Sequence, residues 1–147
     1  MSDITQIAMA IFVGIAGAES SWGKDPRAWE RGRHGAGPLQ VTRICCEDYN
    51  RRKRHVGQED AALTWPDAFL GSEAWENSEA VYLDHCNHYG RALQERYGTV
   101  PTGWELPLIW RYGYAGCVRE NWSDPEGYWA KVAARRKRPE AGKGGAR

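Results

Sequence analysis

The sequence predicts a mainly α-helical single domain of about five to seven helices. Apolar residues recur at steps of three and four in residues 4–18 and again in residues 72–97, which is the spacing of one helix face. No run of residues shows a convincing strand pattern of alternating apolar and polar side chains. At 147 residues the chain is long enough to bury a core within one domain.

The first predicted helix covers residues 4–18, with Ser2 or Asp3 as its N-cap. Glu19 lies four residues after Ile15, so its carboxylate continues the apolar stripe of this helix. A carboxyl group on an apolar face loses hydration when it ionises, so its pKa is expected to rise. The pattern equally allows a surface Glu near a frayed helix end. The stripe consists of Ile4, Ile7, Ala8, Ile11, Phe12 and Ile15.

A loop is predicted over residues 23–38, which are rich in Gly and Pro. A second helix is predicted over residues 41–54, with Thr42 as its cap and Gly57 after its end. The basic run at residues 51–54 is interpreted as a solvated helix face rather than a nucleic-acid contact.

Residues 64–69 are predicted to form a turn or a short helical piece. A long helix then covers residues 72–97, and Gly98 is expected to end it. A shorter helix begins within residues 103–107.

The Tyr- and Gly-rich residues 112–116 are predicted to form a bend after this shorter helix. Asp124 followed by Pro125 is typical of a helix start, so a last helix is predicted over residues 126–136.

Charge divides the chain into two unequal parts. Residues 131–147 hold seven Lys or Arg against one Glu, which leaves 13 basic and 18 acidic side chains in residues 1–130, a net charge of −5. We therefore predict a folded domain at residues 1–133 and a basic, disordered tail at residues 134–147.

Aromatic composition is unusual, with eight Trp and seven Tyr against two Phe. Rings with a polar handle suit half-wet surfaces and the faces of sugars, and they also pack well in cores. The apolar run at residues 7–18 is too short to span a bilayer, and no Lys or Arg precedes it. We interpret it as a core helix rather than a signal peptide.

The cysteines and histidines do not predict a metal site, and no cofactor is expected. Buried free thiols are the expected state, although one or two disulfides remain open if the chain is exported. His85 and His88 have no partner at metal-ligand spacing. The four cysteines are Cys45, Cys46, Cys86 and Cys117.

Four segments in a fixed order carry a resemblance to a known family. They read GAESSW from residue 17, GAGPLQVT from residue 35, DYNRR from residue 48 and YWAKV from residue 128. Over residues 4–132 the chain resembles the lytic transglycosylase and goose-type lysozyme superfamily, and is most similar to its small single-domain members. The resemblance implies a lysozyme-like fold with a sugar-binding groove.

The resemblance also implies roles for individual residues. Glu19 matches the catalytic acid and base of the family, and Ser20 matches a residue that supports the site by hydrogen bonding. Arg111 stands where the family has Asn, a departure that affects the expected product-side contacts. The residues implied to bind the sugar are Ser20, Gly37, Leu39, Gln40, Trp110, Tyr112 and Tyr114.

Glycoside cleavage commonly uses a second carboxylate beside the proton donor. Asp25, Glu30 and Asp48 are candidates, and none of them stands out. A lytic transglycosylase needs only one Glu, because the N-acetyl and 6-hydroxyl groups of the substrate supply the other functions. The resemblance therefore implies cleavage of the β-1,4 bond between MurNAc and GlcNAc in peptidoglycan. It leaves open whether the product is a 1,6-anhydro or a hydrolysed sugar.

Two other function classes compete with this expectation. Arg111 and the cysteine usage favour a non-catalytic glycan-binding or virion structural domain with the same fold. The basic tail favours a nucleic-acid-associated protein, whereas the acidic balance of residues 1–130 opposes it. We expect a monomer whose partner is the glycan strand of peptidoglycan, with no obligatory nucleic acid. It would act at the cell wall or periplasm, after delivery by a phage particle or a secretion system.

Overall fold

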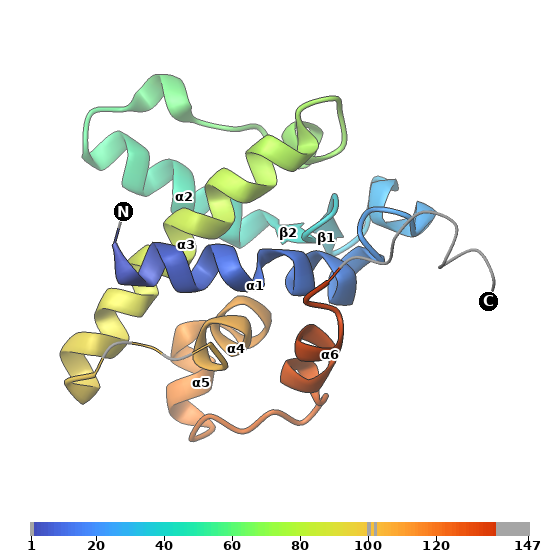
Figure 1. Cartoon of the computed structure of the whole chain (residues 1–147). Helices are drawn as coiled ribbons and strands as arrows, with labels where there is room; N and C mark the ends of the chain where they lie inside the picture. The colour runs from blue at the N-terminus through green and yellow to red at the C-terminus, as the bar shows by residue number, and fades with distance from the viewer. Residues whose placement is uncertain (1, 100, 102, 138–147) are drawn as a thin grey trace.

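The computed structural model describes residues 2–99, 101 and 103–137 (Figure 1). Within these residues the chain forms one mainly α-helical domain with six α-helices and one small two-stranded sheet. The α-helices are α1 Asp3–Ser20, α2 Arg43–His55, α3 Ala74–Tyr97, α4 Glu105–Tyr112, α5 Tyr114–Arg119 and α6 Tyr128–Ala134. Short 3-10 helices span Pro26–Trp29, Glu59–Ala61 and Asp67–Phe69.

Helix α1 is the central element of the domain. It crosses the middle of Figure 1, with α2 above it and α4, α5 and α6 below it, and it packs against both α3 and α6. Its stripe residues Ile4, Ala8, Ile11 and Ile15 are buried, as predicted. An apolar helix surrounded by others in this way holds the core together and fixes the position of the residues at its ends.

The caps explain where several helices begin and end. Ser2 accepts a hydrogen bond from the backbone of Thr5, and Thr42 accepts one from Cys45, which confirms both predicted N-caps. Gly98 follows α3 in the left-handed conformation that favours glycine, as predicted.

Three local predictions were wrong. Residues 112–116 are not a simple bend, because only Gly113 breaks the helix and α5 begins at Tyr114. The last helix begins at Tyr128 and ends at Ala134, inside the predicted range of 126–136. The predicted loop at 23–38 contains the 3-10 helix Pro26–Trp29 and one strand.

The two strands of the small sheet flank the glycine-rich turn. Strand β1, Gly35–Ala36, pairs antiparallel with β2, Val41–Thr42, across the turn that contains Gly37 and Gln40. Strands of two residues are too short to show the alternating pattern on which a strand prediction depends.

Three further expectations concern the cysteines, a possible membrane span and the basic tail. Every described cysteine is a free thiol, and His, Cys, Asp and Glu side chains form no metal-binding group among the described residues. No helix in the described ranges is long and apolar enough to cross a membrane. Most of the predicted tail, residues 138–147, lies outside the described residues.

Candidate active site

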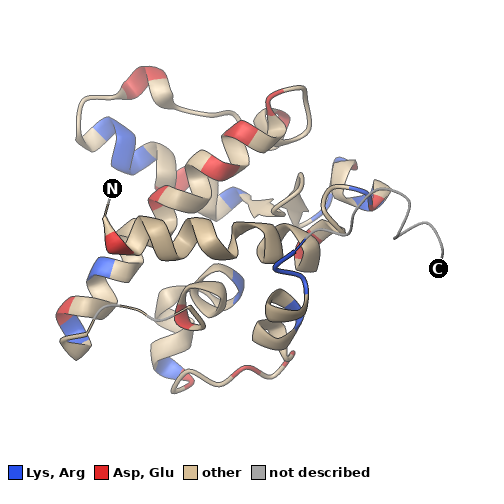
Figure 2. Cartoon of the chain, in the orientation of Figure 1, with Lys and Arg blue, Asp and Glu red and all other residues tan. Residues whose placement is uncertain are grey.

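Glu19 lies in the last turn of α1 and is largely removed from solvent. Its side chain is 8% exposed, and burial raises the pKa of its carboxyl group above the usual value for Glu. Figure 2 shows α1 without charge except near its two ends, where Asp3 begins the helix and Glu19 lies in its last turn. The sequence prediction of a buried carboxyl with a raised pKa is therefore confirmed.

Tyr128 is the closest partner of this carboxyl group. Its hydroxyl donates a hydrogen bond of 2.6 Å to Glu19 Oε2 across 109 positions of sequence. The phenol is itself buried, and burial together with the carboxylate raises the pKa of Tyr128 well above its usual value. Tyr128 therefore remains a donor throughout the neutral pH range and holds Glu19 in one orientation.

Two features position Tyr128 beside Glu19. Gly14 of α1 lets α6 approach closely, since a Cβ atom there would lie 2.5 Å from the carbonyl oxygen of Val132. Asp124 is not the N-cap of α6, which is Gly127, but its carboxylate accepts hydrogen bonds of 2.8 Å from the backbone of Tyr128 and of Trp129 at the start of the helix. The close helix contact and these hydrogen bonds together determine where the Tyr128 ring lies.

Arg111 is the second partner of Glu19. Its Nη1 lies 3.7 Å from Glu19 Oε1, and its Nε donates a hydrogen bond of 2.7 Å to Glu126. The Arg111 charge lowers the pKa of Glu19, as does the Tyr128 hydrogen bond, but burial is the largest influence and the net direction is upward. Arg111 therefore contacts the acidic group directly.

The glycine-rich turn is fastened to the end of α1 by Ser20. The Ser20 hydroxyl donates a hydrogen bond of 2.6 Å to the carbonyl oxygen of Pro38 and accepts one from the backbone of Gly23. Gly37 has a φ of +76°, and a Cβ atom there would lie 2.2 Å from the carbonyl oxygen of Phe69. Only glycine fits such a position, which explains the residue type at the centre of the turn.

Three of the residues that the resemblance implies to bind the sugar, Ser20, Gly37 and Leu39, are buried and do not line an open cleft. Ser20 is 1% exposed and Leu39 is 0% exposed, so their side chains hold the turn from within the core and are not accessible to a ligand. Gln40 is half-buried and donates a hydrogen bond of 2.8 Å to the carbonyl oxygen of Gly37. Of the turn residues, Gln40 is the one whose side chain borders an open cleft.

This cleft has a volume of about 870 Å³ and lies between the turn, the start of α2, and the α4–α5 segment. Its lining includes the predicted residues Gln40, Trp110, Tyr112 and Tyr114, together with Arg111. A cleft of this size with aromatic walls is suited to a ligand with flat apolar faces. Glu19 itself is not in the lining, and Arg111 is the residue that borders both.

The aromatic walls are held in place by hydrogen bonds and ring contacts. Trp110 Nε1 donates to the carbonyl oxygen of Leu39 at 3.2 Å. The Tyr112 hydroxyl donates to Asp124 at 2.6 Å, so the same carboxylate fixes a wall of the cleft and the start of α6. Tyr114 stacks on Tyr89 with ring centroids 5.6 Å apart.

The candidates for a second carboxylate lie in different environments. Asp25 caps the 3-10 helix Pro26–Trp29, and its hydrogen bonds from Arg27 lower its pKa. Glu30 follows that helix and is exposed, and neither residue lines the cleft. Asp48 does line the cleft, but it forms a 2.6 Å ion pair with Arg51.

Cys45 and His85 also border the cleft, with Cys45 Sγ 3.7 Å from His85 Nδ1. Burial raises the pKa of Cys45 to about 12 and lowers that of His85 to about 4. Both groups are therefore neutral near pH 7, and the pair lacks the thiolate that nucleophilic catalysis by cysteine requires.

No protein-family model, curated protein or solved structure matches this chain. Sequence reasoning did not assign Tyr128 to the site, although the tyrosine opens the YWAKV segment that contributed to the family resemblance. It identified Arg111 as a departure without assigning it a contact with Glu19. Gly14, a residue without a side chain in the middle of α1, is the sequence feature that could have indicated the close approach of another helix.

Proposed function

We propose that this chain is a peptidoglycan-cleaving enzyme of the lytic transglycosylase kind, with a lysozyme-like fold and Glu19 as its single catalytic acid and base. The observation that carries the proposal is the buried Glu19 carboxyl group, with its raised pKa and its hydrogen bond from Tyr128. The sequence motifs around Glu19 and Gln40 add the substrate class, the β-1,4-linked MurNAc–GlcNAc strand.

The chemistry begins with proton transfer. The Glu19 carboxyl donates its proton to the glycosidic oxygen as the bond from that oxygen to C1 breaks, so the leaving sugar departs with a free hydroxyl. The carbonyl oxygen of the substrate's own N-acetyl group stabilises the electron-poor C1. The Glu19 carboxylate then removes the proton of the 6-hydroxyl, whose oxygen bonds to C1 and gives a 1,6-anhydro product.

Glu19 changes from acid to base in this sequence, and its partners serve both states. Burial favours the protonated form that starts the reaction. The hydrogen bond from Tyr128 and the charge of Arg111 stabilise the carboxylate after the proton has left. A single carboxyl suffices for this route, which agrees with the ion-paired state of Asp48.

A non-catalytic glycan-binding domain is the second candidate, and Arg111 is the observation that favours it. Arg111 lines the cleft whereas Glu19 does not, so Arg111 must shift before a glycosidic oxygen approaches Glu19 from the cleft. This shift breaks the exposed ion pair with Glu126, which opposes it by only about 0–1 kcal/mol, and it also breaks the contact of Arg111 with Glu19. The enzymatic proposal therefore requires a movement of one side chain.

Mass spectrometry of the soluble products from purified peptidoglycan tests the proposal. The wild-type chain should release muropeptides with 1,6-anhydro ends, and Glu19→Gln should release none above background. Reducing ends in place of anhydro ends would identify a lysozyme. Binding of peptidoglycan by the wild-type chain without any product would refute the enzymatic proposal and support the glycan-binding domain.

A further inference from the structure

The cleft has the opposite charge to the body of the domain. Residues 1–130 carry a net charge of −5, yet the described residues that line the cleft include four arginines and one acidic residue. A concentration of positive charge in a concave site favours an anionic ligand there. The charged lining residues are Arg33, Arg43, Arg111, Arg119 and Asp48.

Ion pairs reduce this set to two free cations. Arg111 pairs with Glu126, Arg119 pairs with Glu120 at 3.2 Å, and the acidic Asp48 is occupied by Arg51. Arg33 and Arg43 form no ion pair with any described residue. Their charge is therefore available to a ligand.

Of these two arginines, Arg43 is the one whose guanidinium group packs on an aromatic ring. It is the first residue of α2, and its guanidinium carbon lies 5.0 Å from the centroid of the Trp65 ring. Trp65 is held in turn by a hydrogen bond of 2.8 Å from its Nε1 to the carbonyl oxygen of Val41. An arginine held over an aromatic ring keeps its N–H groups free at its edge, where they match the two oxygens of a carboxylate.

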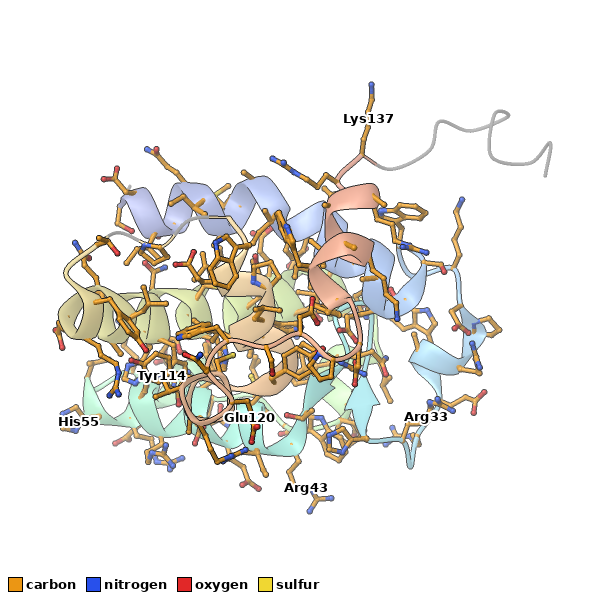
Figure 3. All side chains as sticks on the ribbon, turned by 90° about the horizontal axis from the view of Figure 1, so that it is seen from below. Arg33, Arg43, His55, Tyr114, Glu120 and Lys137 are labelled. Atoms are coloured by element: carbon orange, nitrogen blue, oxygen red, sulfur yellow. The ribbon has the colours of Figure 1, made fainter. Side chains whose placement is uncertain are left out.

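The position of Arg43 agrees with a role at the border of the cleft. In Figure 3 its side chain points outward from the body of the domain at the start of α2. Trp65 and Arg43 both line the cleft. The pair thus combines a flat apolar ring, suited to the face of a sugar, with a cation beside it.

We propose that the cleft selects glycan strands that carry free carboxylates, and that Arg43 on Trp65 binds one of these carboxylates. This inference rests on the proposed function for the glycan backbone. The lactyl group of MurNAc ends in a carboxylate, which is free wherever the stem peptide has been removed. The preferred substrate is accordingly a peptide-free strand, the product of an amidase-type reaction that cuts the bond between lactyl group and peptide.

Binding to matched glycan strands tests this inference. Glu19→Gln is used as the background so that no strand is cleaved during the measurement. Peptide-free strands should bind about tenfold more tightly than the same strands with methyl-esterified carboxylates, because one charge-assisted contact is lost. Arg43→Gln in this background should abolish most of that difference, and Arg43→Lys should keep part of it.

Arg54→Gln is the matched control, since Arg54 is an exposed arginine of the same helix outside the cleft lining. It should keep the full preference for charged strands, and thermal melting of each variant verifies that the fold is retained. Equal binding of charged and esterified strands, or an unchanged preference in Arg43→Gln, would overturn the inference. Duplex DNA that binds as tightly as the charged strands would overturn it too, in favour of a general polyanion surface.

Selectivity for charged strands and enzymatic cleavage can be lost independently of each other. An enzyme that cleaves charged and esterified strands equally well keeps the proposed function and loses the selectivity. A protein that prefers charged strands but cleaves none keeps the selectivity and loses the enzymatic activity.

Discussion

Glu19 and Asp48 are two acidic residues near one cleft, and they differ in their burial and in the partners of their carboxyl groups. Glu19 ends the apolar helix α1, is 8% exposed, and receives a hydrogen bond from Tyr128. Asp48 lies on the polar helix α2, is 22% exposed, and is paired with Arg51. The helix that carries each residue determines its surroundings.

This difference shows how a fold selects one acid for proton transfer. Burial makes the charged form of Glu19 costly, so its pKa rises and it retains its proton at higher pH. The Asp48 carboxylate is instead held by the guanidinium of Arg51 at 2.6 Å on the surface of α2. Four experiments test this difference between the two acids.

The largest effect is expected when each carboxylate is replaced by its amide. Glu19→Gln should lower the rate of peptidoglycan cleavage by about 10²–10⁴-fold, because general acid catalysis contributes an effect of this size. Asp48→Asn should lower it by less than about threefold, since the exposed ion pair that it removes is weak. Turnover assays on purified peptidoglycan measure both. Comparable losses in the two variants would show that two carboxylates catalyse the reaction.

The next effect concerns the tyrosine that orients Glu19. Tyr128→Phe removes one hydrogen bond of 2.6 Å and keeps the ring that packs against α1. We expect a loss of about tenfold or more in turnover, because net stabilisation by a hydrogen bond to a charged group is about 1.5–3 kcal/mol.

Tyr82→Phe is the matched control for this tyrosine, since its buried hydroxyl donates a hydrogen bond of 2.7 Å to the carbonyl oxygen of Ala8 and lies outside the cleft lining. It should affect stability more than turnover. If Tyr128→Phe retained full turnover, Tyr128 would have only a packing role.

A smaller effect is expected on the pH profile. Arg111 lowers the pKa of Glu19, so Arg111→Gln should raise it. Activity requires the protonated acid and is lost as the pH rises through that pKa, so the alkaline limb of the profile should move to higher pH in the variant.

The rate of cleavage across a series of buffers from about pH 4 to pH 9 measures this shift. Arg119→Gln, which removes a cleft arginine paired with Glu120, should leave the limb in place. A shift to lower pH in Arg111→Gln would contradict the assigned interaction.

The smallest effect is expected on stability, and its measurement requires no substrate. Because the folded-state pKa of Glu19 is raised, the folded protein binds its proton more tightly than the unfolded chain does. The stability of the wild type should therefore fall as the pH rises from the unfolded-state pKa of Glu19 through its folded-state pKa. Glu19→Gln lacks this group and should show an increasing advantage in Tm over the same range.

Asp48→Asn provides the comparison, since its ion pair with Arg51 is at the surface. It should change Tm only slightly, because an exposed ion pair contributes little to stability. A Tm difference between Glu19→Gln and wild type that does not change with pH would show that Glu19 ionises in the folded protein as it does in water.

Local sequence rules predicted the elements that depend on neighbours along the chain. The spacing of Ile11, Ile15 and Glu19 predicted a buried carboxyl, because residues four apart share one helix face. Thr42 predicted the start of α2, because a cap contacts a backbone N–H only three residues away. Both predictions required no knowledge of the rest of the fold.

Packing between distant segments decided everything else about the site. Tyr128 reaches Glu19 from 109 positions away, and Arg111 reaches it from α4, because Gly14 lets α6 approach α1 and Asp124 fixes the start of α6. No spacing rule relates such positions, since their proximity arises from the way that whole helices pack. Patterns in the sequence predicted every α-helix except α5, together with the acidic group at the end of α1. The packing of distant helices determines which groups surround that acid and which cleft arginines have no ion pair among the described residues.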